Sequence, residues 1–209
     1  MDISRIRAVV FDCDGVMFDT AMANRKYYDE VLEHFGKPPL DDEQFKQVHM
    51  MTVKDAIAYL FPEKKDPVPV YRYLQGVGYA KFIRFMVMEK GLRQLLDRLE
   101  HNGYIRAVAT NRTNTMEKVI KDFGLGTCFD EVMTAAMVKN PKPDPEQLLR
   151  IMEKFDLEPD EILFIGDSDY DRQAAHRAGT VFAAFKNSAL EADFNVDSMD
   201  EIGVILGLN

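Results

Sequence analysis

The sequence predicts an α/β fold: a doubly wound parallel sheet with helices on both faces, and a helical insert near the N-terminus. From residue 89 onward, short apolar runs alternate with segments whose apolar residues recur at helical spacing, which is typical of parallel strands joined by crossover helices. Between about residues 17 and 88 only helical patterns occur. We therefore expect a core formed by residues 1–16 and 89–209 and a helical domain formed by residues 17–88.

The first expected strand is the apolar run over residues 8–11, and the insert leaves the core shortly after it. In the insert, apolar residues recur one turn apart before Gly36 and again after Thr52, and aromatic residues mark a last helix near residues 82–86. A structureless connection of this length would be implausible in a compact domain, so a helical insert is the better interpretation.

Behind the insert, the expected core elements follow in alternation. They are a helix over 91–100, a strand over 106–111, a helix capped by Asn114 with Glu117 and ended by Gly124, a strand over 129–134, a helix capped at Asp144 with Pro145, a strand over 162–165, a helix ending at Gly179 and a strand over 181–185.

Composition excludes several classes of function. With 46% hydrophobic and 29% charged residues, the 209-residue chain is expected to be globular. Its apolar runs are far shorter than the roughly 20 residues of a membrane helix, and the first residues run straight into a strand, so we expect neither a membrane span nor a signal peptide. A net charge of −9 argues against a nucleic-acid partner. Cys13 and Cys128 show no metal-binding spacing and no disulfide framework, which favours the cytoplasm.

Polar residues gather where the expected strands end. They are Asp12, Asp14, Thr110, Asn111, Lys142, Asp167, Ser168, Asp169 and Asp171. Because ligands of parallel sheets bind at the carboxyl ends of the strands, we expect these residues to share one edge. Several carboxylates beside a single lysine would repel one another unless a divalent cation lay among them. Oxygen ligands without His or Cys favour a hard ion, so we expect Mg²⁺.

These residues form four motifs in a fixed order. The motifs are Asp12-x-Asp14-Gly15-Val16, the strand-ending Thr110, Lys142 in Lys-Pro-x-Pro-Glu, and Gly166-Asp167-Ser168-x-x-Asp171. A lone Asp-x-Asp is weak evidence because turns are rich in Asp, but four ordered matches are specific. The pattern resembles the haloacid dehalogenase superfamily, in the style of its phosphoglycolate phosphatases and β-phosphoglucomutases. The resemblance implies a Rossmann-like core, with the insert as a small helical (C1) cap domain.

Four catalytic roles follow from phosphoryl-transfer chemistry and agree with the resemblance. Asp12 would be the nucleophile and form an aspartyl phosphate. Asp14 would protonate the leaving oxygen and then deprotonate the attacking water. Thr110 would donate its hydroxyl to a phosphoryl oxygen, and Lys142 would neutralise both the nucleophile and the transferring group.

The resemblance also implies a set of metal ligands. Mg²⁺ would be held by the carboxylates of Asp12 and Asp167 and by the main-chain carbonyl of Asp14. Asp171 would be either a ligand itself or a partner of the ligands.

Three further residues are candidates for binding the substrate. Gly15 lets the backbone approach the phosphate closely, and main-chain amides around Asn111 would bind phosphoryl oxygens. Lys54 lies in a segment where similar enzymes place a basic residue near the substrate; the alternative is a solvated lysine in the first turn of a helix. Arg112 follows Thr110 and Asn111, where similar phosphatases often carry a basic residue, so a modest electrostatic role is expected for it.

Other polar residues are expected to be structural. Asp19 would cap a helix or tie the hinge, Asp144 would cap a helix, and Asp169 would be solvated. Cys13 would point into the core as a small apolar group.

Hydrolysis of a small phosphate monoester, a phosphorylated metabolite, is the leading prediction for function. A sugar phosphomutase and a phosphonate hydrolase using Lys54 are alternatives, although similar mutases carry a histidine near the position of Asn24. A receiver-like phosphoaspartate switch is the non-enzymatic alternative. Such domains lack a helical insert, and Asp14 would have no function in one. The motifs specify neither the leaving group nor the choice between monomer and homodimer.

Overall fold

The computed structural model describes residues 2–49 and 51–208. The chain forms two compact units: a core unit, Met1–Asp19 with Val87–Asn209, and a helical unit, Thr20–Met86. Among the described residues, no helix combines the length and the apolar character needed to cross a membrane.

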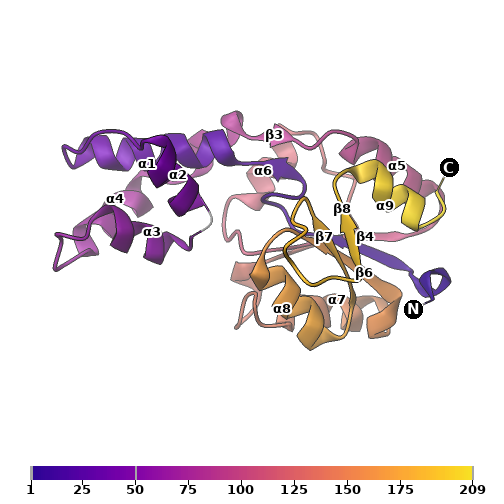
Figure 1. The fold of residues 1–209 in the computed structure, drawn as a ribbon. Helices are drawn as coiled ribbons and strands as arrows, with labels where there is room; N and C mark the ends of the chain where they lie inside the picture. Colours follow the sequence, from indigo (N-terminus) through magenta and orange to yellow (C-terminus); the bar gives the residue numbers. More distant parts are fainter. Residues whose placement is uncertain (1, 50, 209) are drawn as a thin grey trace. The chain divides into compact units, whose positions relative to one another are not determined.

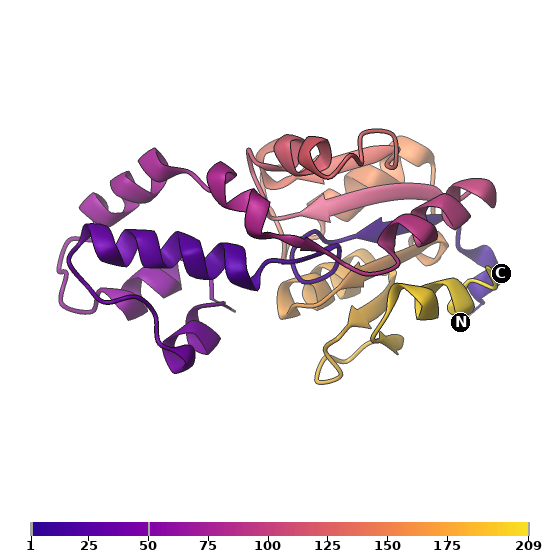
Figure 2. The same ribbon diagram turned by 90° about the horizontal axis from the view of Figure 1, so that it is seen from above.

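The core unit is built on a six-stranded parallel sheet (Figures 1 and 2). Its strands are β1 (Ala8–Phe11), β4 (Ile105–Thr110), β5 (Glu131–Thr134), β6 (Ile162–Gly166), β7 (Val181–Phe185) and β8 (Phe194–Val196), in the spatial order β5-β4-β1-β6-β7-β8. The chain runs outward from β1 through β4 to β5, then returns to the other side of β1 with β6. The strand order therefore reverses at β1, in the centre of the sheet.

Strand β1 is apolar along its whole length because both of its faces are covered. All four of its residues are buried, and Phe11 pairs with Val108 on one side and Ile165 on the other. This burial explains why β1 has no alternation of polar and apolar residues. The pairing of β1 with β4 and β6 carries the residues that follow to one edge of the sheet.

Helices cover both faces of this sheet (Figure 1). They are α5 (Leu92–His101), α6 (Met116–Asp122), α7 (Glu146–Phe155), α8 (Asp169–Ala178) and α9 (Met199–Ile205). Helix α5 packs against α9 on one side, and α7 packs against α8 on the other. The leucines of α5 that recur at helical spacing are all buried, as the amphipathic pattern predicts.

A short antiparallel pair, β2 (Phe18–Asp19) and β3 (Val87–Met88), lies where the chain leaves and re-enters the core unit. The helical unit between these strands contains α1 (Ala21–His34), α2 (Asp42–His49), α3 (Val53–Leu60), α4 (Val68–Val77) and a 3₁₀ helix over Ala80–Phe85. Its own apolar core includes Tyr28, Val31, Ile57 and Leu74. The last helix expected in the insert is therefore a 3₁₀ helix.

The predicted fold class is confirmed by the parallel sheet and its flanking helices. One detail of helix capping is wrong. Helix α6 starts after Thr115 rather than after Asn114, without a side-chain cap, whereas Gly124 has the positive φ of 63° expected at its end. Strand β8 and helix α9 were not predicted, because they have only three and seven residues.

Candidate active site

The carboxyl ends of β1, β4 and β6 bring the four motifs together. Asp12 follows β1, Thr110 ends β4 and Asp167 follows β6. The main-chain N–H of Asp12 donates to the carbonyl of Ile165 at 2.9 Å, which continues the ladder beyond β1. The reversal of strand order at β1 is where sheets of this kind bind ligands, so the motifs meet at the expected edge.

Lys142 supplies a buried cation at this edge. Its ammonium lies 2.7 Å from Asp12 Oδ1 and 2.6 Å from Asp171 Oδ1, and it donates to the carbonyl of Ala109 at 2.8 Å. The Lys142 side chain is 2% exposed. The side-chain amide of Asn111 donates to the main-chain carbonyl of Lys142 at 3.0 Å and ties this loop to the end of β4. Lys142 therefore partly neutralises two carboxylates at once.

Burial and repulsion perturb the titration of the cluster. Burial raises the pKa of Asp12 to about 7, against the lowering effect of Lys142. Burial also raises the pKa of Asp167 to about 8, with added repulsion from Asp12 and Asp171. Burial opposes the charge on Lys142, but the two carboxylates outweigh it and raise the pKa of the ammonium. The cluster therefore contains more negative charge than one lysine balances.

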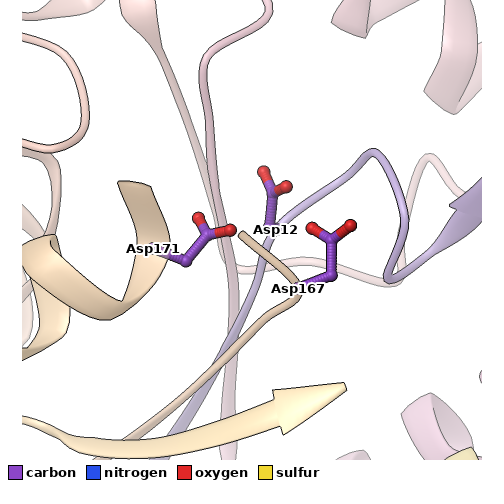
Figure 3. A group of neighbouring side chains, drawn as sticks. All are labelled: Asp12, Asp167 and Asp171. Carbon is purple, nitrogen blue, oxygen red and sulfur yellow. The ribbon is translucent and has the colours of Figure 1, made fainter. Parts of the chain in front are cut away.

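Three carboxylates of the cluster have the arrangement of a cation site. Oxygens of Asp12, Asp167 and Asp171 lie within 4.8 Å of one another (Figure 3). They come from the end of β1, from the loop after β6 and from the first turn of α8. Oxygen donors without nitrogen or sulfur suit a hard ion. Burial, with added repulsion from neighbouring carboxylates, raises the pKa values of Asp12 and Asp167, and the donor set fits a divalent cation such as Mg²⁺.

Asp171 is fully buried, and both of its oxygens have protein donors. Oδ1 contacts Lys142, while Oδ2 accepts from the main-chain N–H of Ser168 at 3.1 Å and from the Ser168 hydroxyl. Ser168 in return caps α8, because its hydroxyl accepts from the main-chain N–H of Asp171. A Cβ at Gly166 would lie 2.3 Å from the Cβ of Asp171, so glycine is needed there. Asp171 thus joins the start of α8 to Lys142.

Gly15 leaves room for the carboxylate of Asp167. A Cβ at Gly15 would lie 2.0 Å from Asp167 Oδ2, and the φ of Gly15 is 79°, in the left-handed region. A side chain would therefore be strained and would displace Asp167. The expected role of Gly15 was close approach to the phosphate; the contact that the structure shows is with this carboxylate.

Asp14 is held by Arg112, a pairing that sequence reasoning missed. Arg112 Nε donates to Asp14 Oδ2 at 2.7 Å, and Nη2 donates to Oδ1 at 2.6 Å. The main-chain N–H of Arg112 donates to the hydroxyl oxygen of Thr110 at 3.1 Å. The Thr110 hydroxyl accepts this hydrogen bond, so its own proton can still be donated to another group. The signal in the sequence was the position of Arg112, two residues after Thr110.

Two amide side chains that sequence reasoning did not identify, those of Gln147 and Asn187, hold main-chain segments next to the site. Gln147 Nε2 donates to the carbonyls of Thr110 and Met133, at 2.8 and 3.2 Å, and so joins the ends of β4 and β5. Asn187 Nδ2 donates to the carbonyl of Asp167 at 2.8 Å. Their partners are main-chain carbonyls, which any residue provides, so no sequence pattern identifies these contacts.

Lys54 is an exposed residue in the first turn of α3, where Thr52 is the N-cap. It belongs to the helical unit, whereas the other candidate residues belong to the core unit. The contact of Lys54 with a substrate stays a prediction.

The residues expected to be structural have local roles. Asp144 Oδ1 accepts from the main-chain N–H of Glu146 at 3.0 Å at the start of α7, and Asp169 is exposed and pairs with Arg172. Cys13 is buried, and burial raises the pKa of its thiol. Asp19 is exposed at the end of β2, and the N-cap residue of α1 is Thr20 rather than Asp19.

Comparison with known proteins adds independent evidence. The pyrophosphatase PpaX of Bacillus velezensis is 28% identical over 100% of both chains. The N-acetylmuramic acid 6-phosphate phosphatase of Pseudomonas putida is 29% identical over 91% of this chain and 87% of its own. The crystal structure of a haloacid dehalogenase superfamily hydrolase of subfamily IA from Geobacter sulfurreducens is 39% identical and superposes with a TM-score of 0.86, covering 97% of each chain.

The family assignment rests on most of the chain. Residues 9–185 match the model described as haloacid dehalogenase-like hydrolase, a range that contains all four motifs. The predictions of an enzyme, and of a phosphatase from this superfamily, are confirmed. The chain belongs to the family of haloacid dehalogenase-like hydrolases.

Proposed function

We propose that this phosphatase hydrolyses small phosphate monoesters with Mg²⁺ as its cofactor, through an aspartyl phosphate on Asp12. The observation that carries the proposal is the set of contacts around Asp12. Its carboxylate lies 2.7 Å from the ammonium of Lys142, with Asp167 and Asp171 beside it. A nucleophile, a cation and a metal site at one point are what phosphoryl transfer requires.

Residues of the core unit would hold the metal ion. The carboxylates of Asp12 and Asp167 and the main-chain carbonyl of Asp14 are the proposed ligands. Bound Mg²⁺ supplies positive charge that lets an anionic phosphate approach the carboxylates and that stabilises the charge developing during transfer. Asp171 already has donors on both oxygens, which supports a role in orienting Lys142.

In the first half-reaction, an oxygen of Asp12 attacks phosphorus. The bond between Asp12 and phosphorus forms as the bond from phosphorus to the leaving oxygen breaks. Asp14 gives its proton to that oxygen, so the product leaves as an alcohol and Asp14 becomes a carboxylate. Lys142 orients Asp12 and neutralises the transferring group, and Thr110 donates its hydroxyl proton to a phosphoryl oxygen.

In the second half-reaction, Asp14 takes a proton from water as the water oxygen attacks phosphorus. The new bond to water forms while the bond from phosphorus to Asp12 breaks, and inorganic phosphate is released. Both aspartates return to their starting states. Main-chain amides near Gly15 and Asn111 are proposed to bind the phosphoryl oxygens in both steps.

The helical unit is proposed to select the leaving group, with Lys54 as a candidate contact for an anionic substrate. Relatives of this chain are named for different substrates, among them pyrophosphate, N-acetylmuramic acid 6-phosphate and phosphoglycolate. Such variety with one phosphoryl chemistry supports a small phosphorylated metabolite as the substrate class.

Turnover of p-nitrophenyl phosphate and of a panel of phosphate monoesters, with and without MgCl₂, tests this proposal. We expect Mg²⁺-dependent turnover that Asp12→Asn abolishes and that Asp14→Asn reduces at least about 100-fold. Asp169→Asn, which alters an exposed acid paired with Arg172, serves as the control and should keep wild-type turnover. Phosphorylation of the protein once, without turnover, would support a phosphoaspartate switch and would contradict the proposal.

A further inference from the structure

The carboxylate of Asp14 is held in one orientation by a side chain outside the four motifs. The guanidinium of Arg112 donates two parallel hydrogen bonds, of 2.7 and 2.6 Å, to the carboxylate of Asp14. The Asp14 side chain is 39% exposed, whereas that of Arg112 is only 8% exposed. A half-exposed carboxylate samples several rotamers unless something fixes it, and a bidentate guanidinium contact fixes both position and plane.

Arg112 is itself anchored at the end of β4. Its Nη1 donates to the hydroxyl oxygen of Thr115 at 3.1 Å, and its main-chain N–H donates to that of Thr110 at 3.1 Å. Thr115 and Thr110 are both buried. The guanidinium is therefore a rigid support, in contrast to exposed pairs such as Arg150 with Glu146, which lie on the surface of one helix.

The backbone of Asp14 is fixed independently of its side chain. The main-chain N–H of Gly15 donates to the carbonyl of Phe18 at 2.9 Å, and Asp14 forms an isolated β-bridge with Phe18. The turn after β1 thus places the Cα of Asp14, while Arg112 places its carboxylate. Loss of Arg112 would release the carboxylate without unfolding the turn.

We propose that Arg112 is a positioning residue that holds the carboxylate of Asp14 where it exchanges a proton with the leaving oxygen and then with water. This inference rests on the proposed function, in which Asp14 is the proton donor and acceptor. Misplacement of a reacting group by about 1 Å costs on the order of 100-fold in rate, so the effect is measurable.

The dependence of rate on the leaving group separates positioning of Asp14 from a structural role. A poor leaving group, such as the alkoxide of an alkyl phosphate, needs its proton during bond cleavage. A good leaving group, such as 2,4-dinitrophenolate, departs without one. A defect in Asp14 therefore lowers kcat/KM, which reports the first half-reaction, much more for alkyl phosphates than for 2,4-dinitrophenyl phosphate, whereas general damage to the site lowers both equally.

The experiment compares Arg112→Lys, Arg112→Gln and Thr115→Val with wild type, each with MgCl₂, on an alkyl phosphate and on 2,4-dinitrophenyl phosphate. We expect kcat/KM, which reports the steps up to release of the leaving group, to fall about 10- to 100-fold on the alkyl phosphate in Arg112→Gln and less than about 3-fold on the dinitrophenyl ester. Arg112→Lys keeps the charge but not the two-point contact, so it should show most of this loss. Thr115→Val, which keeps Arg112 itself, should show the same selective loss in smaller measure.

Two controls separate the possible failures. Arg150→Lys alters an exposed pair and should match wild type on both substrates. In an Asp14→Asn background, Arg112→Gln should cause no further loss, because the group that it positions is gone. Equal losses on both substrates, or a full additional loss in that background, would overturn the inference. Absence of wild-type turnover on every ester would instead overturn the proposed function.

Discussion

Lys142 Nζ lies 2.7 Å from Asp12 Oδ1, and the two side chains are only 2% and 10% exposed. A pair buried this deeply cannot lose one partner at low cost, because the remaining charge stays out of contact with water. Asp171 shares the same ammonium at 2.6 Å, so removal of Lys142 would leave two carboxylates without their cation.

Lys142→Met should therefore destabilise the metal-free protein by about 3–5 kcal/mol in urea unfolding. Its kcat should fall about 100-fold or more, because the charge next to the nucleophile is lost. Lys154→Met removes an exposed lysine that pairs with Glu131 and should cost less than about 1 kcal/mol. Similar losses in the two variants would show that the buried pair has no special role in stability.

Gly15→Ala should weaken Mg²⁺ binding as well as lower the stability of the fold. The new Cβ would lie 2.0 Å from Asp167 Oδ2 and push that carboxylate away. Gly36→Ala is the matched control, since its φ of 69° is similar but, among the described residues other than its chain neighbours, no atom lies within 4 Å of the new Cβ. Both variants should lose about 1–2 kcal/mol from backbone strain. Mg²⁺ titration by calorimetry should show weaker binding, by about tenfold or more, in Gly15→Ala alone.

The metal-free fold should become less stable as pH rises. Burial raises the pKa of Asp12 to about 7 and that of Asp167 to about 8, above the ordinary value of 3.8. The folded protein therefore binds protons more tightly than the unfolded chain between about pH 4 and pH 8, so ionisation across this range favours unfolding. We expect the unfolding temperature, followed by circular dichroism without Mg²⁺, to fall as pH increases through this window.

MgCl₂ should reverse this loss. Its stabilising effect is expected to be larger at about pH 8 than at about pH 5.5, because the ligands must be deprotonated to bind the ion. Asp167→Asn should show a smaller shift with MgCl₂ and a flatter pH dependence. An equal Mg²⁺ shift at both pH values in the wild-type protein would argue against these carboxylates as the ligands.

Gln147→Leu should weaken the fold behind the site. Gln147 is fully buried, and its amide is the donor to two main-chain carbonyls at the ends of β4 and β5. Buried carbonyls without donors cost about 1–3 kcal/mol, which denaturant unfolding would detect. Gln75→Leu, at an exposed position of α4, should change stability by less than about 0.5 kcal/mol.

Lys54→Ala should discriminate between substrates if Lys54 binds an anionic leaving group. We expect kcat/KM to fall about tenfold or more on a carboxylated alkyl phosphate and to stay within about twofold on a neutral aryl phosphate. Lys65→Ala, another exposed lysine of the helical unit, is the control and should match wild type on both. Equal activity of Lys54→Ala on both substrates would mean that Lys54 is a solvated surface residue.

The strands and helices that the sequence predicts well are those with a complete local pattern. Strand β7 has the predicted bounds, and α5 differs from its predicted bounds by one residue at each end. Both are predicted well because a continuous apolar run and leucines at helical spacing directly indicate which side chains are buried. Strand β8 has three residues and forms through its register with β7, which is information that a local pattern does not contain.

Some residues of the candidate site can be identified from the sequence and others cannot. Asp12, Lys142, Asp167 and Asp171 are recognisable because chemistry restricts which residue types can stand there, and the structure brings them together. Arg112 escapes this reasoning because its partner Asp14 lies 98 positions away, and a basic residue after a strand has many possible uses. Contacts of this kind depend on the register of neighbouring strands.

The pairing of β2 with β3 has a consequence for how such proteins diversify. The chain leaves the core unit along one strand and returns along its hydrogen-bonded neighbour, so the two attachment points are about 5 Å apart. Two chain ends at this distance can be connected by a tight turn or by a whole inserted domain. The inserted segment can therefore be exchanged, enlarged or deleted through a change in one continuous stretch of gene, while the register of β1 is preserved.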